Sequence, residues 1–397
     1  MKNRTFLINI NTLKYIIVFF VWIPAYALYN YIPMANRIML FLRLLCSIII
    51  IIKNFSFNWK LEYILIGAYS VIEIVSTLLY NQENLFNVLE FCLCIMSMCV
   101  FFVNLNNYKQ LQFRKAVAFW GIIYAIGITF TCFITPSSMR EDLGLHFFVS
   151  SRANSAQTMI CILVLMFALD FKFYGKPKLI SLLVLIFTGV SMIGLHSGQG
   201  IIMLGIVIIV LVIFTRKKAD KLLYLISPIG VAVINILLNW LIISQAYLNV
   251  SPITYFITNI LKKDVTLTGR DIIYTNIVSI FLKNPLLGFG YENSIVKNSL
   301  SHFAEGYNSA HNSPFQILIE VGIVGFAIFF VLVFLVLARL EKAKTTECYI
   351  VYGGIVAFLI GGITSLAYYN IYFYVLMAFC VGMYCNNKGS FRKDTRE

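Results

Sequence analysis

Charged residues are scarce in this chain, and acidic residues are outnumbered by basic ones. Of its 397 residues 12% are charged, with 17 Asp and Glu against 31 Lys and Arg, whereas 60% are hydrophobic. The apolar residues form repeated runs of about 20 residues, the length of a bilayer-spanning helix. The alternating pattern of a membrane β-barrel is absent. Because helices satisfy their own backbone hydrogen bonds, we predict an all-α polytopic membrane protein.

Motifs for several kinds of chemistry are also missing. The chain has no Asp-x-Asp, His-Glu-x-x-His, Walker, Gly-x-Ser-x-Gly or Gly-x-Gly-x-x-Gly pattern. Metal-assisted, ATP-driven and serine-nucleophile mechanisms therefore lack support. The nine cysteines fall within or at the edges of apolar runs, which indicates neither a disulfide framework nor a zinc site. We expect no metal and no cofactor.

The apolar runs predict about twelve transmembrane helices in a single integral membrane domain, residues 1–397. The first run is long enough to span and has no small-residue cleavage signature, so we expect it to be retained. The predicted spans are 14–32, 38–53, 61–80, 85–105, 115–136, 154–174, 178–196, 200–215, 222–244, 312–338, 348–368 and 370–385.

The distribution of lysine and arginine gives these spans an orientation. Short cytoplasmic loops retain positive charge. With the N-terminus inside, 22 of the 31 basic residues lie on the cytoplasmic side and 8 on the other. We therefore expect both termini to be cytoplasmic and the long loop between the ninth and tenth spans to be extracytoplasmic. This bias and attraction to anionic membrane lipid explain the net charge of +14, so no nucleic acid partner is indicated.

The long loop, residues 245–311, is the one extended polar segment and the first place to look for chemistry. Thr268-Gly269-Arg270-Asp271 resembles a helix start, with Thr268 as N-cap. Isoleucines then recur at helical spacing as far as Pro285, which predicts a short amphipathic helix near 269–283. Such a helix can lie on the membrane surface or pack over the bundle.

Arg270 falls in the first turn of this predicted helix, where the helix dipole disfavours a cation. An anionic ligand would resolve the conflict, because helix N–H groups and a guanidinium would both point at it. The alternative is a surface arginine that pairs with Asp271 or extends into solvent.

His311 begins the tenth span at the outer surface, where an imidazole can exchange a proton near neutral pH. A histidine at a helix start can also be a simple interface residue. Other polar groups are expected on the same side of the membrane, where they could together hold a phosphate or diphosphate. These are His196, Gln199, Arg140, Arg152 and Asn154.

Four charged residues lie inside apolar runs and need partners or water there. Arg43, Glu73 and Glu90 have compatible depths and can form a buried ion-pair cluster that fixes packing, or they can line a functional cavity. Glu320, two turns inside the outer surface and just after His311, is the better candidate for a cavity wall.

Several of these segments resemble the signature region of the O-antigen polymerase and ligase superfamily, the Wzy- and WaaL-type integral membrane glycosyltransferases. The resemblance covers roughly residues 186–335, and the helix layout extends it to the whole chain. It rests on Arg270 with its helix, Asn284-Pro285-Leu286-Leu287-Gly288-Phe289-Gly290, Ala310-His311-Asn312 with Leu318 to Gly325, and Ser151-Arg152-Ala153-Asn154. One departure is Gln199, where many relatives carry an arginine.

This resemblance implies a GT-C-like, metal-independent inverting glycosyltransferase of the bacterial cytoplasmic membrane, which uses an undecaprenyl-diphosphate-linked glycan as donor. Arg270 would bind the diphosphate, and His311 would orient or deprotonate the acceptor hydroxyl. Arg140 and Arg152 would be further diphosphate contacts, and Asn312 and Glu320 would support the site. The absence of arginine at Gln199 suggests that Arg152 or Arg140 supplies the second positive charge.

The first expectation is therefore a polymerase that makes capsule, exopolysaccharide or O-antigen from repeat units, with chain-length regulator and flippase proteins as possible partners. A ligase of the same chemistry is the second, because it differs only in its acceptor. A polysaccharide transporter or flippase is an alternative of another class. It would favour broken helices in symmetric positions and charges near the midplane, whereas polar residues here collect at the outer face.

Overall fold

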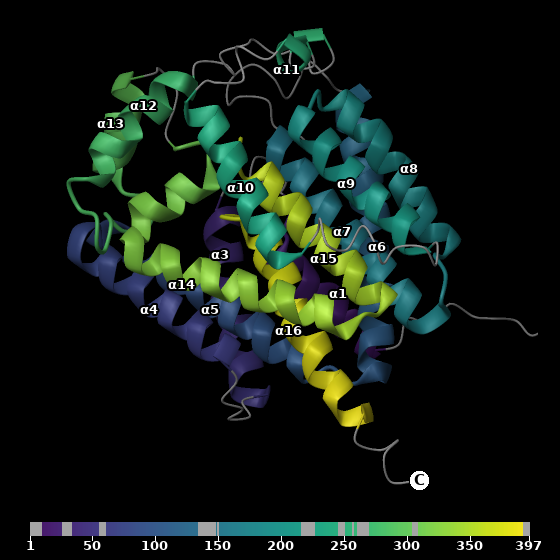
Figure 1. The fold of residues 1–397 in the computed structure, drawn as a ribbon. Coiled ribbons are helices and arrows are strands. Elements are labelled where there is room, and N and C mark those ends of the chain that lie inside the picture. Colours follow the sequence, from purple (N-terminus) through teal and green to yellow (C-terminus); the bar gives the residue numbers. More distant parts are fainter. Residues whose placement is uncertain are drawn as a thin grey trace, which may run out of the picture.

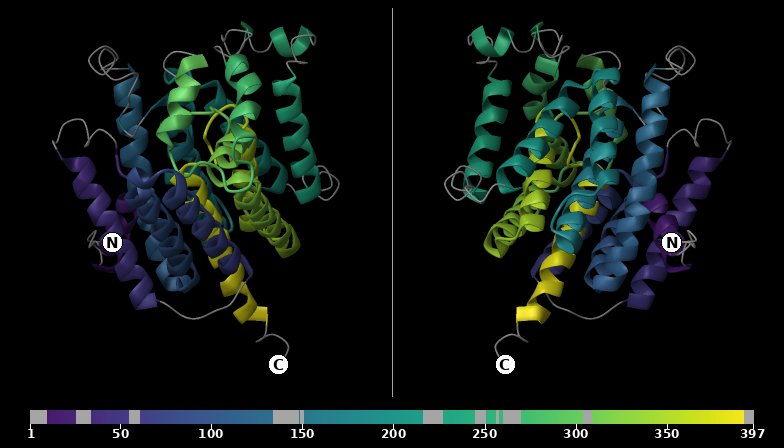
Figure 2. Two further views of the ribbon diagram at one scale, coloured as in Figure 1. Left: turned by 90° about the vertical axis from the view of Figure 1, so that its left-hand side faces the viewer. Right: turned by 90° about the vertical axis from the view of Figure 1, so that its right-hand side faces the viewer.

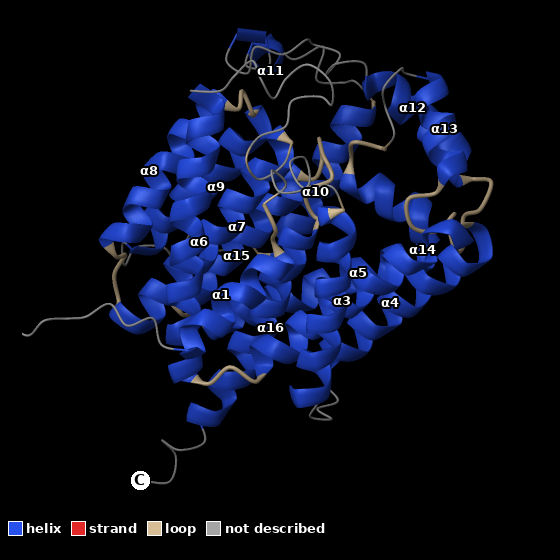
Figure 3. Cartoon of the chain, turned by 180° about the vertical axis from the view of Figure 1, so that it is seen from behind, coloured by secondary structure: helices blue, strands red, loops and turns tan. Residues whose placement is uncertain are grey.

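The computed structural model describes residues 10–25, 34–54, 61–133, 148, 151–215, 227–244, 251–255, 258–259, 270–303 and 309–391 as helices joined by turns (Figure 1). Within these ranges there is no strand (Figure 3), which confirms the predicted all-α class. The helices are α1 (Ile10–Trp22), α3 (Ala35–Asn54), α4 (Leu61–Tyr80), η1 (Gln82–Asn84), α5 (Leu85–Val103), α6 (Asn107–Phe133), α7 (Arg152–Tyr174), α8 (Leu179–Gly194), α9 (Gly198–Thr215), α10 (Pro228–Ile243), α11 (Ser251–Tyr255), α12 (Arg270–Phe281), α13 (Ser294–Phe303), α14 (Ser313–Ala343), α15 (Thr346–Gly361) and α16 (Ile371–Phe391).

Six of the described helices are long and apolar enough to cross a membrane. They are α3, α4, α5 with η1, α6, α7 and α14. Six more apolar helices, of 10–17 residues, are shorter than a full span. A polytopic arrangement is therefore supported, and the count of twelve spans stays a prediction.

The structure differs from the predicted helices in two ways: two predicted helix ends are wrong, and two short helices were not predicted. The first helix ends at Trp22 and not at 32, because Pro24 lacks the N–H that would continue it. α15 ends at Gly361 and not at 368, at a Gly-Gly pair with low helix propensity. α11 and α13 lie within the segment 245–311, where only α12 had been expected.

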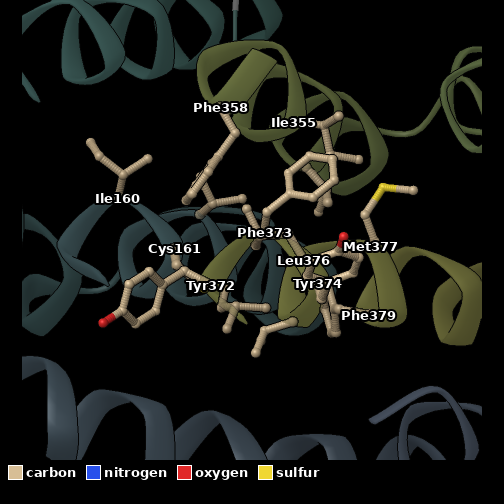
Figure 4. Packing of buried hydrophobic residues seen from close by; sticks show 14 of the residues in the cluster. Ile160, Cys161, Ile355, Phe358, Tyr372, Phe373, Tyr374, Leu376, Met377 and Phe379 are labelled. Carbon is tan, nitrogen blue, oxygen red and sulfur yellow. The ribbon is translucent and has the colours of Figure 1, made fainter. Parts of the chain in front are cut away.

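The core of the bundle is built around α7. It packs against α6, α8, α9, α15 and α16, and 83% of its most apolar window is buried. A helix surrounded on all sides has no polar face, which explains why its hydrophobic residues show no amphipathic pattern. Figure 4 shows how Ile160 and Cys161 of α7 meet Phe358 of α15 and Phe373 of α16.

Helices α11, α12 and α13 lie at the opposite end of the bundle from the end of α16. In Figure 1 helices α11, α12 and α13 are at the top and the end of α16 is at the bottom, and both views in Figure 2 agree. We call the end that carries α11, α12 and α13 the loop end.

A buried charge network ties three helices together away from the loop end. Asp170, near the end of α7, is fully buried. Its Oδ1 accepts from Arg114 Nε of α6 at 2.8 Å, and its Oδ2 accepts from Ser181 Oγ of α8 at 2.6 Å and from the backbone N–H of Lys178 at 2.8 Å. Both oxygens of this carboxylate therefore accept hydrogen bonds, as a buried charge requires.

Replacing this carboxylate is expected to destabilise the fold. Asp170→Asn removes the negative charge and leaves the buried Arg114 guanidinium uncompensated, which typically costs about 3–5 kcal/mol. We expect lower abundance in membranes and a lower Tm in detergent. Glu83→Gln, at an exposed position of η1, is the matched control and should behave as the wild type. Equal Tm values for the two variants would contradict the role assigned to Asp170.

Candidate functional site

Helix α14 is broken at Gly322, just inside the loop end. Gly322 has φ 64° and ψ −170°, a non-helical conformation. In a continuous helix the N–H groups of Ile323 and Val324 would donate to the carbonyls of Ile319 and Glu320, four residues earlier. The break frees these two donors and two acceptors inside a packed, apolar region, where unsatisfied backbone groups are costly.

Residues 284–291 insert into this break and satisfy all four groups. Two of their carbonyls accept from α14, and two of their N–H groups donate to it. The pairs are Ile323 N to Pro285 O at 2.9 Å, Val324 N to Leu286 O at 3.4 Å, Phe289 N to Ile319 O at 2.8 Å, and Gly290 N to Glu320 O at 2.9 Å. Two of the segments that carried the resemblance therefore form one structural unit, which we call the kink clamp (residues 284–291 and 319–324).

The glycines of the kink clamp are required by both conformation and space. Gly290 has φ 82°, and a Cβ there would lie 2.6 Å from the Cα of Thr77 in α4. A Cβ on Gly322 would lie 2.2 Å from the carbonyl oxygen of Leu286. Only glycine combines a positive φ with so close a backbone approach. Glycine at these positions therefore lets the chain pass closely between α4 and α14.

The segment that follows the clamp is held against α4 and η1 by amide side chains. Asn81 Nδ2 donates to the carbonyl of Tyr291 at 2.5 Å, and Asn84 Nδ2 donates to that of Glu292 at 3.1 Å. Asn293 Nδ2 donates to the carbonyl of Tyr80 at 2.9 Å. The loop end is therefore anchored on two sides, by α14 and by the α4–η1 corner.

Glu320 belongs to this scaffold. The residue is 1% exposed, and its Oε1 accepts from Gln316 Nε2 at 2.7 Å and from the backbone N–H of Glu292 at 3.0 Å. Gln316 in turn accepts from the backbone N–H of Ala310 at 2.9 Å. The carboxylate thus connects the clamp to the residue that precedes His311, and a role of Glu320 in the site stays a prediction.

The other charged residues inside apolar runs, Arg43, Glu73 and Glu90, make two separate contacts. Arg43 pairs with Glu90 at 3.0 Å between α3 and α5, which is the packing alternative. Glu73 is fully buried in α4, where its Oε2 contacts Cys92 Sγ at 3.9 Å.

Asn312 caps α14 and fixes the backbone beside His311. The residue is fully buried, and its Oδ1 accepts from Phe315 N at 3.0 Å. Its Nδ2 donates to Ile363 O at 2.9 Å and to Asn239 Oδ1 of α10 at 2.8 Å. Because all its polar atoms bond within the protein, we assign Asn312 a positioning role.

His311 lies half-buried at the loop end, in a left-handed conformation with φ 48°. Non-glycine residues seldom adopt this conformation, although histidine does so more readily than most. The hydroxyl of Tyr274 in α12 donates to the His311 carbonyl at 3.4 Å. The backbone of His311 is therefore held from α12 on one side and by the Asn312 cap on the other.

Helix α12 packs over the bundle through a second, separate hydrophobic core. Its inner face is fully buried against residues of α13 and the start of α14. The cluster comprises Ile273, Tyr274, Ile277, Ile280, Val296, Leu300, Ala310 and Ile319. Of the two alternatives for the amphipathic helix, packing over the bundle is the one observed. The helix spans Arg270–Phe281, close to the predicted 269–283.

Arg270 is the first residue of α12, one helical turn before Tyr274 on the same face. Tyr274, which contacts the His311 backbone, therefore lies one helical turn from Arg270 on the same side of α12. The side chain of Arg270, all of Arg140 and the predicted N-cap Thr268 lie outside the described residues. The meeting of the Arg270 guanidinium with the His311 ring thus stays a prediction.

Asn312 and Asn154 both contact a non-helical segment, residues 362–370, that the apolar runs do not predict. Ser313 N donates to Gly362 O at 2.7 Å, and Asn370 Nδ2 donates to Asn154 Oδ1 at 3.0 Å and to Gln157 Oε1 at 2.7 Å. The segment therefore links the start of α14 to the start of α7. In the sequence this segment is marked by Gly361-Gly362 at its start and by Tyr368-Tyr369-Asn370 at its end.

Gln199, in the first turn of α9, lies against the end of α15. Its Nε2 contacts Met203 Sδ at 3.4 Å. It also lies 3.2 Å from the point that a Cβ on Gly361 would occupy. Arg152 is half-buried at the start of α7, and His196 is exposed in the turn between α8 and α9. The fold thus brings Asn312 and Asn154 to one segment and Gln199 to the helix end just before it, whereas His196 is exposed in its turn.

The loop end of this apolar bundle combines a buried, polar, irregular backbone with a histidine and with a helix that begins at an arginine. This combination indicates a helical membrane protein with a candidate site at its loop end. Among the described residues, no three His, Cys, Asp or Glu side chains form a group that could hold a metal.

Comparison with known families identifies the class further. Residues 179–330, from α8 to the middle of α14, match the Wzy_C family, described as O-antigen ligase. This match confirms the resemblance to the O-antigen polymerase and ligase superfamily. No curated protein matches the chain significantly. The family and the apolar helices together indicate an integral membrane enzyme of the ligase or polymerase type.

Proposed function

We propose that this protein polymerises polysaccharide repeat units by transferring a growing undecaprenyl-diphosphate-linked glycan onto a lipid-linked repeat unit. The observation that carries the proposal is the docking of α12, which starts at Arg270, onto the backbone of His311 through Tyr274. Both residues lie within the matched family region, 179–330.

The chemistry requires positioning and charge stabilisation more than bond activation. The acceptor hydroxyl oxygen attacks the anomeric carbon, the bond from that carbon to the diphosphate breaks, and undecaprenyl diphosphate leaves with the electron pair. Inversion follows from attack opposite the leaving group. His311 orients the hydroxyl and takes its proton. Arg270 and the N–H groups at the start of α12 stabilise the departing negative charge.

The remaining candidate residues have proposed roles in substrate binding or in positioning His311. Arg140 and Arg152 are proposed as further contacts to the diphosphate, since Gln199 carries no charge. Asn154, Gln199 and His196 are proposed to contact the glycan at the loop end. Asn312 and Glu320 hold the His311 segment through the hydrogen bonds described above.

The second candidate is a ligase that transfers the finished glycan to a different acceptor. The description of the matched family as O-antigen ligase favours it. Polymerase and ligase share the donor and the reaction at the anomeric carbon, so the same residues would serve both.

The lipid-linked glycans that accumulate in a deletion strain test the proposal. We expect single lipid-linked repeat units on the outer face, because initiation and flipping continue without polymerisation. Long lipid-linked polymers would show a lost ligase. Repeat units trapped on the cytoplasmic face would show a lost flippase and would overturn the assignment of an enzyme. Complementation with the wild-type chain is the control.

A further inference from the structure

Helix α10 is apolar and largely exposed, yet it carries two asparagines one helical turn apart. Ile236, Leu237 and Trp240 are each more than half exposed. Asn235 is 6% exposed, and Asn239, four residues later on the same face, is half-buried. An amide on an apolar helix is costly unless it is hydrogen-bonded. The partners of these two side chains therefore show what α10 is held against.

The two asparagines belong to a head-to-tail chain of amides that ends at Asn312. Asn235 Nδ2 donates to Leu359 O at 3.1 Å, and Asn239 Nδ2 donates to Asn235 Oδ1 at 3.0 Å. Asn312 Nδ2 donates to Asn239 Oδ1 at 2.8 Å, and Asn312 Oδ1 accepts from Phe315 N at 3.0 Å. A carbonyl can only accept and an N–H can only donate, so the two backbone ends fix the direction of the whole chain.

The chain begins and ends where helix ends need partners. The last four carbonyls of an α-helix have no donor within the helix. The turn after α15 supplies N–H donors to three of them, Phe358, Ile360 and Gly361. Asn235 supplies the donor to the fourth, Leu359. The other end of the chain is the N-cap of α14, so α10 joins the end of α15 to the start of α14.

Helix α10 also contacts α12. It packs against α12, α14 and α15 (Figure 1). Ile242, three residues after Asn239, packs against the second hydrophobic core, which includes Tyr274 of α12. The Tyr274 hydroxyl donates to the His311 carbonyl at 3.4 Å. One side of α10 therefore reaches the His311 segment by two routes, through α12 and through the α14 cap.

We propose that Asn239 is a positioning residue for His311. It holds the Asn312 amide, whose cap fixes the start of α14 and the backbone next to the histidine. His311 has a left-handed φ of 48°, a conformation that persists only where the surroundings hold it. Loosening the cap therefore displaces the imidazole from the acceptor hydroxyl. The inference rests on the proposed function, in which His311 takes the proton of that hydroxyl.

Steady-state kinetics of the full-length protein test the proposal, with the lipid-linked repeat units that accumulate in the deletion strain as substrate. Asn239→Leu keeps the approximate volume and removes the acceptor of Asn312. We expect kcat to fall about tenfold, the effect of one hydrogen bond in a buried site. KM should be unchanged, because no group assigned to substrate binding is altered. A wild-type kcat overturns the proposal.

Asn104→Leu is the matched control. Asn104, at the end of α5 that is remote from η1, donates to Asn54 O at 3.0 Å and to Val100 O at 2.8 Å. Its replacement also removes a half-buried amide, so Tm should fall in both variants, whereas kcat should fall only in Asn239→Leu. An equal loss of kcat in both variants would show a general effect of stability and would overturn the positioning role.

A second background separates positioning of His311 from support of the fold. In His311→Asn no imidazole is left to place, so adding Asn239→Leu should cause no further loss of kcat. A further tenfold loss overturns the proposal. If Asn239→Leu does not fold, Asn239→Ser replaces it, because a serine hydroxyl can donate to Asn235 O within the helix but is one atom too short for Asn312.

The positioning role and the proposed function fail by different results. A wild-type kcat in Asn239→Leu, together with a low kcat in His311→Asn, removes Asn239 from the mechanism and leaves the role of His311 in place. A near-normal kcat in His311→Asn contradicts proton transfer by that ring, and with it the proposed function, whatever Asn239→Leu does.

Discussion

Substituting His311 by asparagine, or Arg270 by alanine, is expected to lower polymer formation by about a hundredfold while the protein stays folded in the membrane. Asparagine tolerates the left-handed conformation of His311, with φ 48°, but cannot take a proton at this position. Arg270→Ala removes a charged contact to the leaving group, an interaction that strengthens as negative charge develops. Polymer length on a gel and the rate of repeat-unit consumption measure both effects.

A matched cation on the neighbouring helix provides the control. Lys297 in α13 pairs with Glu292 at 2.9 Å, and both side chains are about 40% exposed. Such exposed pairs contribute little. Lys297→Ala should therefore leave polymer unchanged. If Lys297→Ala and Arg270→Ala reduce polymer equally, the segment acts through its overall charge, and the specific role of Arg270 is wrong. Near-normal polymer in His311→Asn would exclude proton transfer by that ring.

The sequence was sufficient for features that depend on local pattern. Apolar runs of bilayer length gave the helical class, and the isoleucine spacing after Arg270 gave α12 to within two residues at its C-terminal end. Gly288 and Gly290 belong to the motif that carried the resemblance, and both have positive φ. In each case the physical cause lies within a few residues of chain: periodicity, capping or the conformational freedom of glycine.

Features that depend on contacts between distant segments could not be predicted. The break at Gly322 is stable only because residues 284–291 replace the missing hydrogen bonds. No local sequence pattern predicts that these two segments pair. Residues 362–370 lie among apolar residues on both sides, so hydropathy continues through them. Their backbone is stabilised by Asn312 and Ser313, which are about fifty residues earlier in the chain. The missed site elements are thus the long-range ones.

Replacing Gly322 by alanine is expected to have the largest effect on stability of any single methyl addition in the kink clamp. The new Cβ would lie 2.2 Å from Leu286 O and 2.6 Å from Leu287 N, both backbone atoms that cannot rotate away. The backbone conformation of Gly322, with φ 64° and ψ −170°, is essentially restricted to glycine and adds about 1–3 kcal/mol for a residue with a Cβ. Relief of the overlap must displace residues 284–291, and each backbone hydrogen bond lost costs about 1 kcal/mol.

The sum is several kcal/mol, a large part of the about 5–15 kcal/mol that stabilises a typical protein. Gly67→Ala in α4 is the matched control, because a Cβ there has no atom within 4 Å. We expect Gly322→Ala to show low abundance and a Tm well below that of Gly67→Ala, which should equal or exceed the wild type since alanine favours helices. A wild-type Tm for Gly322→Ala would mean that α14 can straighten without residues 284–291. In that case the clamp would not be what positions Ala310 and His311, and the link from Glu320 through Gln316 to the site would lose its structural basis.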